Sequence, residues 1–299
     1  MRILVAGRAG QIATELLARL PAHGHEAVGL EPPELDITRA ESIAAAFARV
    51  RPEAVVNAAA YTAVDRAEDE RDLAFAVNAT GPRLLGEAAA RAGIPVVHFS
   101  TDYVFDGAKG APYVEEDAPD PVGVYGASKL AGEQALHAAN PRSTTLRTAW
   151  VCSPHGTNFV KTMLRLAAER EVLRVVADQH GAPSFAGDLA EAAIALLPRL
   201  AAAPAGDPCF GVFHLTGTPH TTWHGFTAAI LAGAAARGRK APRLEAITTA
   251  EYPTKARRPA DGRLDCGRAA RVLGLAPADW RVSLDRCLDA LIGPKETTR

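Results

Sequence analysis

The sequence has no surplus of charge of either sign, since 33 Lys and Arg residues are matched by 34 Asp and Glu residues. Proteins that bind nucleic acid normally carry a basic excess or a basic stripe, so we expect no nucleic-acid partner. No apolar run reaches the roughly 18 residues that a membrane-spanning helix needs. The N-terminal stretch MRILVAGRAG also lacks the long apolar core and cleavage site of a signal peptide. We therefore expect a cytoplasmic protein with no membrane partner.

Cysteine is scarce as well. The chain has four cysteines, Cys152, Cys209, Cys266 and Cys287, and no two of them form a C-x-x-C pair. This spacing favours neither a zinc site nor a disulfide scaffold. We predict reduced and mostly buried thiols, and no bound metal.

The first half of the chain alternates short apolar runs with Ala- and Leu-rich helical stretches. Apolar runs without alternating polar residues, separated by helices, indicate a parallel sheet covered on both faces. Thr38 with Glu41 three residues later forms a capping-box pattern that would open the second helix. The fold class is therefore α/β, with a doubly wound, Rossmann-like parallel sheet. The predicted strands are Ile3–Ala6, Ala27–Leu30, Ala54–Asn57, Pro95–Ser100 and Thr144–Arg147, and the predicted helices are Gln11–Leu20, Thr38–Val50, Leu73–Arg91 and Val124–Ala139.

After Trp150 the alternation of predicted strands and helices becomes less regular. With 299 residues the chain is long enough for one large domain or two modest ones. We predict a dinucleotide-binding domain over residues 1–150 and a smaller α/β substrate-binding lobe over 151–299, with segments near 179–200 returning to the first domain. The second half contains predicted helices at Phe159–Glu169, Asp188–Arg199 and Thr222–Arg237, predicted strands at Leu173–Val176 and Val212–Leu215, and a connector at Ala201–Pro208.

A glycine turn lies between the first predicted strand and its helix. Gly7 and Gly10 occupy the turn, and Ala13 provides a third small position in the pattern G-x-x-G-x-x-A. A pyrophosphate can meet backbone N–H groups and the positive end of the helix dipole at such a turn. The alternative is a turn with a structural role only, because strand–glycine–helix turns are common.

Acidic residues follow the next strand. Glu31 closes it, where a carboxylate could accept hydrogen bonds from ribose hydroxyls, although an exposed loop glutamate explains it nearly as well. Its charge would disfavour a 2′-phosphate, which Arg8 could in turn bind, so the choice between NADH and NADPH stays open. Asp36 and Ile37 could reach an adenine edge, and capping of the following helix is the alternative for Asp36.

The residues from Asn57 to Ala60, at the end of the third predicted strand, all have small side chains. They would leave room for a flat ligand at the carboxyl edge of the sheet, where open α/β sheets bind ligands. Turn geometry alone would also explain them.

Ser100, Thr101 and Asp102 follow a central strand, and Tyr125 and Lys129 are spaced four residues apart on a predicted helix. Residues at i and i+4 share one helix face, and a lysine ammonium near a phenol lowers its pKa from about 10 toward neutrality. A hydroxyl such as that of Thr101 can steady a substrate oxygen while the phenol protonates it. Ser and Asp also end strands without any catalytic role, and Y-x-x-x-K occurs on surface helices by chance. The glycine turn upstream favours the catalytic interpretation.

With these residues in view, the chain resembles the extended short-chain dehydrogenase/reductase superfamily, and within it the dTDP-4-dehydrorhamnose reductase family. The likeness runs from the N-terminus to PADWRVSLDRCL near the C-terminus. It is carried by the strings VVNAAAYTAVDRAE, STDYVFDG, VYGASKLAGE, LRTAWV, NFVKTMLRLA, DQHGAPS and YPTKARRPADGRLD.

The resemblance implies a role for each matching position. Tyr125 would be the proton donor, Lys129 its activator and a ligand of the nicotinamide ribose, and Thr101 the third catalytic residue. The dinucleotide would be bordered by Gly10, Gln11, Ile12, Asp36, Ile37, Ala60, Tyr61 and Thr62. The sugar nucleotide would be bordered by Thr101, Asp102 and Trp150, for which core packing is the alternative. Arg257 and Arg258 look like a diphosphate-facing pair, because guanidinium suits phosphate oxygens, although a solvated basic loop is equally consistent.

The implied reaction is reduction of the 4-keto group of dTDP-4-dehydro-β-L-rhamnose by NADPH or NADH, giving dTDP-L-rhamnose. The partner is then this sugar nucleotide, and the protein is expected to be a monomer or a homodimer. Some relatives are thought to dimerise through acidic residues and a divalent ion. Glu15 and Asp188 suit such roles, but Ala290 stands where another acid is expected, so we do not expect a metal-bridged dimer.

Two other functions remain open at this point. The first is another sugar-nucleotide enzyme of the superfamily, an epimerase or dehydratase, which would keep NAD bound through purification. Dehydratases usually add an acidic pair at the hydroxyl-bearing strand end, whereas here Asp102 stands without a neighbouring glutamate. The second is a non-catalytic regulatory subunit of the methionine adenosyltransferase type, which the presence of Thr101, Tyr125 and Lys129 disfavours.

Overall fold

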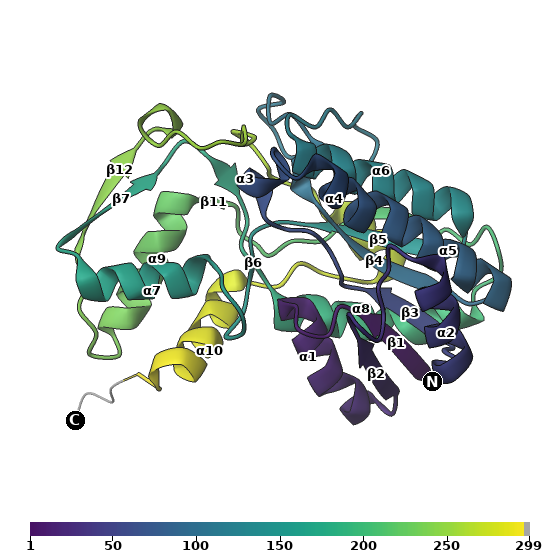
Figure 1. The fold of residues 1–299 in the computed structure, drawn as a ribbon. Helices are drawn as coiled ribbons and strands as arrows, with labels where there is room; N and C mark the ends of the chain where they lie inside the picture. Colours follow the sequence, from purple (N-terminus) through teal and green to yellow (C-terminus); the bar gives the residue numbers. More distant parts are fainter. Residues whose placement is uncertain (296–299) are drawn as a thin grey trace.

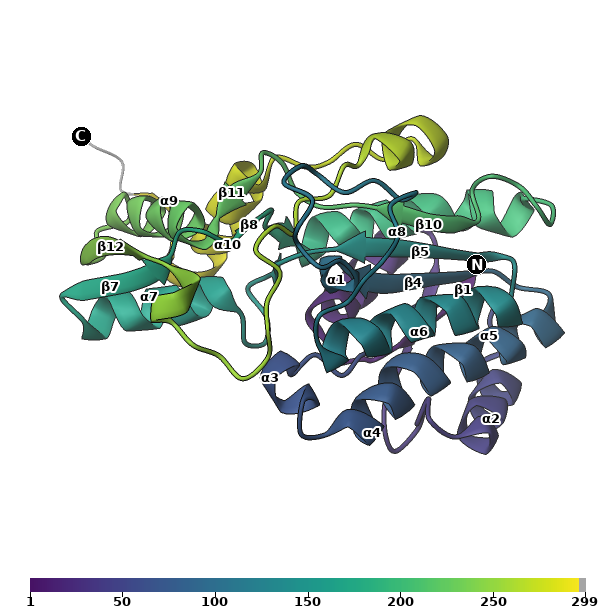
Figure 2. The same ribbon diagram turned by 90° about the horizontal axis from the view of Figure 1, so that it is seen from above.

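The computed structural model describes residues 1–295 and contains a six-stranded parallel sheet, with helices on both faces, beside a smaller group of helices and strands (Figures 1 and 2). The strands are ordered β10-β5-β4-β3-β1-β2, and every neighbouring pair is parallel. The predicted α/β doubly wound fold is therefore confirmed. The strands of this sheet are β1 (Arg2–Ala6), β2 (Glu26–Leu30), β3 (Ala54–Asn57), β4 (Val96–Thr101), β5 (Ser143–Thr148) and β10 (Gly211–His214).

Strand β1 illustrates why the sequence shows apolar runs rather than alternation. Its Ile3 and Val5 pack into a core with helices α1 (Gln11–Arg19) and α8 (Ala186–Ala202). Its Leu4 and Ala6 pack on the opposite face against helices α2 (Ala40–Val50), α5 (Gly81–Ala92) and α6 (Val124–Ala139). Because both faces are buried, successive residues of the strand are all apolar.

Helix α2 begins later than the capping-box pattern predicts. It starts at Ala40, and its N-cap is Arg39, which makes no side-chain cap hydrogen bond. The Thr38 hydroxyl donates instead to Asp36 Oδ1 at 2.7 Å, and the Thr38 backbone N–H does so at 2.9 Å. The predicted capping box is therefore wrong, because the Asp36 carboxylate takes up Thr38 in a local turn.

The single helix predicted over Leu73–Arg91 is divided into three segments. Helix α4 (Arg71–Phe75) passes into a π turn (Ala76–Thr80), which leads into α5. Pro82 has no N–H with which to reach the carbonyl of Asn78 four residues earlier, so the regular α pattern cannot continue through it. That carbonyl faces α6 at Gly132, where an added Cβ would lie 1.9 Å from it. The break therefore lets α6 pack closely.

The smaller group has its own core. Strands β7 (Val172–Val176) and β12 (Arg243–Ile247) form a parallel pair, covered by α7 (Phe159–Glu169), α9 (Trp223–Ala235) and α10 (Trp280–Ile292). The shorter helical segments are α3 (Val64–Ala67), η1 (Leu20–His23), η3 (Asp102–Val104), η4 (Thr249–Glu251) and η5 (Ala269–Leu273). The shorter strands are β6 (Val151–Cys152), β8 (His180–Gly181), β9 (Ser184–Phe185) and β11 (Thr221–Thr222).

Two segments beyond residue 150 pack with the N-terminal half. Helix α8 lies against α1 in the core of one sheet face, and β10 pairs with β5 in the central sheet. The division of the chain at residue 150 stays a prediction. The four cysteines are buried and unpaired, as predicted. Within residues 1–295, none of the helices combines the length and apolar composition required to cross a membrane.

Candidate active site

A cavity of about 500 Å³ opens at the carboxyl ends of the central strands. It extends from the glycine turn after β1, past the ends of β3 and β4, to helix α6. Because the carboxyl ends of parallel strands meet at one edge, residues far apart in sequence converge there. Of the residues predicted for the site, the following line it: Gly10, Gln11, Ile12, Ala60, Thr62, Thr101, Asp102, Tyr125, Lys129 and Trp150.

The glycine turn has the geometry that a pyrophosphate needs. Gly7 adopts φ +93°, and an added Cβ would lie 2.9 Å from the backbone N and Cα of Ala59, so only glycine fits. Gly10 is the N-cap of α1, whose first turn carries no acidic residue and receives no side-chain cap hydrogen bond. The first N–H groups of α1 are thus available to an anion, and the helix dipole favours negative charge there. These residues fit a dinucleotide.

Gln11 connects the glycine turn to the chain after β6. Its Oε1 accepts hydrogen bonds from Ser153 Oγ at 2.8 Å and from Asn158 Nδ2 at 2.9 Å. Its Nε2 donates to the carbonyl of Val151 at 3.4 Å. The side chain therefore holds one wall of the cavity in place.

Tyr125 and Thr101 line the same cavity as close neighbours. Burial raises the pKa of the Tyr125 phenol well above its usual range, and the neighbouring Thr101 hydroxyl opposes that rise only in part. Lys129 Nζ donates to the carbonyl of Phe99 at 2.7 Å, and the burial of Tyr125 governs the pKa of the phenol. The expectation that Lys129 brings the pKa of Tyr125 toward neutrality is therefore wrong for the free protein. The phenol stays protonated, which is the state that a proton donor requires.

The pKa of Lys129 is also shifted from its ordinary value. The side chain is buried on α6, and burial lowers its pKa to about 8 because the ammonium loses its water, while the charge of Glu133 acts in the opposite direction. A lysine with this pKa can hold or release its charge near neutral pH.

Asp102 stands beside Thr101. Burial raises its pKa to about 7, and the hydroxyl of Thr101, which donates to its Oδ1 at 3.0 Å, opposes that rise only in part. Gly262 packs on the other side, where an added Cβ would lie 2.4 Å from Asp102 Oδ2. The carboxyl group is thus enclosed at the edge of the cavity.

Trp150 forms part of the cavity wall with a second tryptophan that the sequence did not suggest. It adopts φ +47°, an uncommon conformation for a residue with a side chain, and its ring stacks on Trp223 with centroids 3.6 Å apart and planes at 14°. Trp223 comes from the first turn of α9, 73 residues later in the chain. No local pattern connects the two rings, so only the tertiary fold reveals the pair.

Several predicted cofactor residues lie outside this lining. The Glu31 carboxylate accepts a hydrogen bond from the N–H of Ala9 at 2.9 Å, within the glycine turn, and lies 3.6 Å from Arg8. The Tyr61 hydroxyl donates to a glutamate, Glu70, at 2.6 Å. Asp36 accepts from Thr38, as described above, and Ile37 is buried against Gly81. The roles of Glu31, Asp36, Ile37 and Tyr61 toward a cofactor stay predictions.

A second cavity, of about 580 Å³, adjoins the first and shares Tyr103 and Trp223 with it. Among the described residues that line it are four arginines, Arg165, Arg170, Arg174 and Arg258, and no acidic residue. Of the predicted diphosphate pair, Arg258 lies here, with its Nη2 2.8 Å from Asp65 Oδ2, whereas Arg257 is exposed and lines neither cavity. The other three arginines were missed because they are dispersed over α7, its C-cap and β7, where their spacing resembles that of ordinary surface residues.

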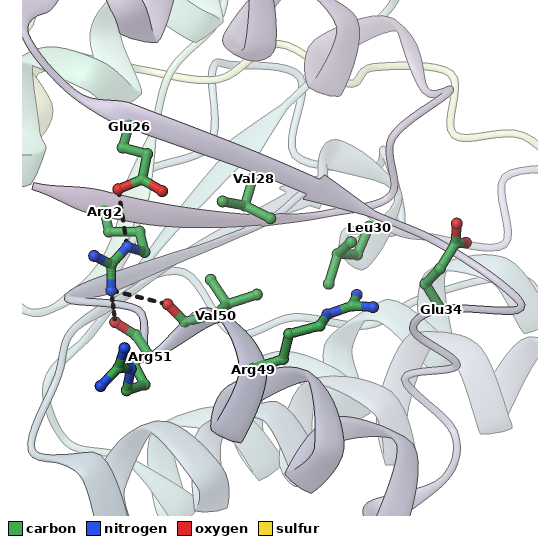
Figure 3. Close-up of a pocket in the computed structure, with 8 residues that line it drawn as sticks. All are labelled: Arg2, Glu26, Val28, Leu30, Glu34, Arg49, Val50 and Arg51. Atoms are coloured by element: carbon green, nitrogen blue, oxygen red, sulfur yellow. Dashed lines mark hydrogen bonds and ion pairs between the residues drawn. The ribbon is translucent and has the colours of Figure 1, made fainter.

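A third hollow, of about 480 Å³, runs along the edge strand β2 and the end of α2 (Figure 3). Its Arg2 donates to Glu26 Oε2 at 2.9 Å and to the carbonyls of Val50 and Arg51 at 3.1 and 3.3 Å. Its lining contains none of the predicted site residues. We therefore place the chemistry in the first cavity.

The acids considered for a metal contact are paired with bases. Glu15 forms an ion pair with Arg19 and lies 3.2 Å from His155 Nε2, and Asp188 lies 3.0 Å from Arg286. Over residues 1–295, no group of three or more His, Cys, Asp or Glu residues is arranged to hold a metal ion. The metal-free site stays a prediction.

A doubly wound parallel sheet with a glycine turn at its first strand, and with threonine, tyrosine and lysine at the same edge, defines an oxidoreductase of the extended short-chain dehydrogenase/reductase class. Comparison with known proteins agrees. A sequence model described as the RmlD substrate binding domain matches residues 1–292. A dTDP-4-dehydrorhamnose reductase of Sinorhizobium fredii (strain NBRC 101917 / NGR234) is 44% identical over 292 residues, which are 98% of this chain and 98% of that protein.

Solved structures give the same result. The crystal structure of a dTDP-4-dehydrorhamnose reductase from Clostridium acetobutylicum has a TM-score of 0.91 and 34% identity, covering 97% of this chain and 99% of that one. The dTDP-4-dehydrorhamnose reductase of Bacillus anthracis str. Ames in complex with NADP has a TM-score of 0.88 and 33% identity, covering 96% and 98%. The chain belongs to the dTDP-4-dehydrorhamnose reductase family, as the sequence motifs predicted.

Proposed function

We propose that this protein reduces the 4-keto group of dTDP-4-dehydro-β-L-rhamnose with NADPH or NADH, giving dTDP-L-rhamnose in the last step of dTDP-rhamnose synthesis. The observation that carries the proposal is the convergence of Thr101, Tyr125 and Lys129 on a cavity that begins at the glycine turn. The family membership and the NADP bound to the Bacillus anthracis relative support the reaction class and the coenzyme.

The chain's own residues divide the work between them. The turn at Gly7 and the N-terminus of α1 would hold the pyrophosphate, and the coenzyme supplies the hydride when bound. Tyr125 gives its phenolic proton to the substrate's 4-oxygen as negative charge develops there, while the hydroxyl of Thr101 holds that oxygen. The charge of Lys129 stabilises the phenolate that Tyr125 becomes, and the same side chain is suited to a ribose hydroxyl.

The second cavity suits the nucleotide of the substrate. A nucleoside diphosphate needs cationic donors for its phosphate oxygens and an aromatic surface for its base. The four arginines supply the donors, and Tyr252, Phe159 and Trp223 supply aromatic surface. Since this cavity shares Tyr103 and Trp223 with the first, the sugar of one ligand would lie beside Tyr125 while its diphosphate lies among the arginines.

The setting and assembly of the protein are part of the proposal. Four buried, unpaired thiols suit a reducing compartment, which favours the cytoplasm. A monomer or a homodimer is expected, and the elution volume in size-exclusion chromatography distinguishes them.

The test is a spectrophotometric assay at the reduced-nicotinamide band with dTDP-4-dehydro-L-rhamnose, using NADPH and NADH in parallel. Tyr125→Phe should lower kcat by about 10²–10⁴-fold, because general acid catalysis contributes that much, while coenzyme affinity is unchanged. Tyr113→Phe is the matched control, since that phenol is buried away from the cavity and donates to Asp106 at 2.6 Å. Undiminished turnover in Tyr125→Phe would exclude Tyr125 as the proton donor, and no oxidation of either coenzyme by the unchanged protein would refute the function.

A further inference from the structure

A line of buried polar side chains lies beneath Lys129 and is not used by the chemistry described above. Asn57 at the end of β3 is 1% exposed, His98 on β4 is fully buried, and Lys129 on α6 is 2% exposed. Asn57 and His98 are direct neighbours in the register of the two parallel strands. Three elements far apart in sequence thus place an amide, an imidazole and an amine in a row.

The hydrogen bonds in this line have a defined direction. The backbone N–H of Ala59 donates to Asn57 Oδ1 at 3.2 Å, which orients the amide so that its Nδ2 faces His98 Nδ1 at 3.0 Å. An amide nitrogen can only donate, so Nδ1 of His98 is the acceptor and carries no proton. Burial, the charge of Lys129 and, to a smaller extent, that of His137 on α6 lower the pKa of His98 well below its usual range, which keeps the ring neutral. The proton of the neutral ring is therefore on Nε2.

That proton points at the catalytic lysine. His98 Nε2 lies 3.5 Å from Lys129 Nζ. An Nε2–H group opposes an ammonium, which has only protons to offer, but it can donate to the lone pair of a neutral amine. The one hydrogen bond that the lysine itself donates within the described structure goes to the carbonyl of Phe99 at 2.7 Å. His98 thus favours the uncharged form of Lys129.

The other charged or titratable groups around the lysine come from its own helix and from the sheet edge. Glu133, one turn later on α6, favours the ammonium, but the carboxylate is held by Arg147 of β5 at 2.7 Å. Tyr125 precedes the lysine by one turn and is protonated, and the charge of Asp102, the first residue of η3, acts on Tyr125. His98 is therefore the group from the sheet that faces the amine most directly, together with the carbonyl of Phe99.

We propose that Asn57 and His98 are positioning residues that set the protonation state of Lys129 through the tautomer of His98. Asn57 holds the ring with its proton on Nε2, and that proton makes the lysine easy to discharge. The effect on turnover rests on the proposed function, in which the charge of Lys129 stabilises the phenolate. The tautomer and the titration of the lysine are properties of the free protein and do not depend on that function.

Asn57→Asp is the variant that reverses the tautomer. One carboxylate oxygen still accepts from the N–H of Ala59, and the other now accepts from His98, so the ring proton moves to Nδ1. Nε2 then offers a lone pair to Lys129, and the added negative charge acts in the same direction. The titration midpoint of the lysine should rise by about one pH unit or more, the size of shift that a favourable charged neighbour produces. Asn78→Asp is the matched control, because Asn78 is equally buried and its amide donates to Ser128 rather than to His98.

Three measurements test the inference. The ¹⁵N spectrum of the unchanged protein should show His98 neutral with its proton on Nε2, and that of Asn57→Asp should show the proton on Nδ1. The ¹³Cε resonance of Lys129 should titrate at a higher pH in Asn57→Asp than in the unchanged protein or in Asn78→Asp. The alkaline limb of the kcat/KM profile should move upward with it.

The outcomes separate the inference from the function. A proton on Nδ1 in the unchanged protein would overturn the inference, and this measurement decides it even if Asn57→Asp does not fold. A reversed tautomer with an unmoved lysine midpoint, or an equal rise in Asn78→Asp, would also overturn it. A raised midpoint with an unmoved pH–rate profile would support the tautomer control and count instead against the role of Lys129 in turnover.

Discussion

Replacement of Glu133 by leucine should destabilise the fold strongly, because it strands a buried charge. Glu133 and Arg147 form an ion pair whose side chains are 3% and 4% exposed. Arg147 Nε lies 3.0 and 3.2 Å from the two carboxylate oxygens, and Nη2 lies 2.7 Å from Oε2. The guanidinium also lies 5.1 Å from the ring centroid of Phe105. Glu133→Leu removes three charge-assisted hydrogen bonds while the arginine stays in place.

The size of the effect follows from burial. Breaking a buried ion pair by removing one partner costs about 3–5 kcal/mol, because the remaining charge keeps its desolvation penalty. A loss of that size is a large part of the roughly 5–15 kcal/mol that keeps a protein folded. At about 2 °C per kcal/mol for a chain of this length, Tm should fall by about 6–10 °C.

A second substitution distinguishes a stranded charge from lost packing. Arg147→Met in the Glu133→Leu background removes the unpaired guanidinium, so most of the lost stability should return. Thermal unfolding followed by circular dichroism, with urea unfolding as a second measure, gives the free energies for the cycle. If the double variant is no more stable than Glu133→Leu alone, the reasoning from the buried charge is refuted.

Two further changes have expected outcomes. Gly7→Ala should lower both Tm and coenzyme affinity, because a φ of +93° costs about 1–3 kcal/mol for alanine and the new Cβ would collide with Ala59. Gly24→Ala is the control. Its φ is +75°, but no atom lies within 4 Å of the added Cβ, so it introduces the backbone strain without the collision. Asp102→Asn should stabilise the protein increasingly as pH rises. The folded pKa of about 7 lies above the ordinary 3.8, so the unchanged protein carries no penalty below pH 4 and loses stability between pH 4 and 7, by up to about 4 kcal/mol. Urea unfolding at pH 4 and pH 8 measures this, and an equal gain at both values would contradict it.

The sequence alone determined the elements whose cause is local. Helix α6 runs from Val124 to Ala139 and α7 from Phe159 to Glu169, as the apolar pattern predicts, because the periodicity of buried side chains decides both. The glycine turn could also be recognised, since its chemistry lies within one strand–turn–helix unit. The spacing of Tyr125 and Lys129 placed both on one helix face, and the strand ending at Thr101 placed a hydroxyl at the same edge.

Predictions from local sequence patterns were wrong where two hydrogen-bond acceptors compete for one donor, or where residues distant in the sequence decide the structure. The predicted capping box at Thr38 does not form, because the Thr38 hydroxyl donates to the Asp36 carboxylate instead. The helix predicted over residues 73–91 is interrupted because Pro82 cannot donate to the carbonyl of Asn78, and the absence of a side chain at Gly132 leaves room for that carbonyl. The pKa of Tyr125 was expected to fall, yet burial raises it, since the desolvation of a side chain is a property of the closed fold.

Only the tertiary structure decided which side chains surround the reacting group. The stack of Trp150 on Trp223, the approach of Arg258 to the arginines of α7 and β7, and the row of Asn57, His98 and Lys129 each join residues separated by tens of positions. Sequence periodicity predicts which side of a helix or strand is buried, but it does not predict which other element covers that side. The parallel sheet determines these contacts, because its register brings the carboxyl ends of distant strands, and the side chains that follow them, to one edge.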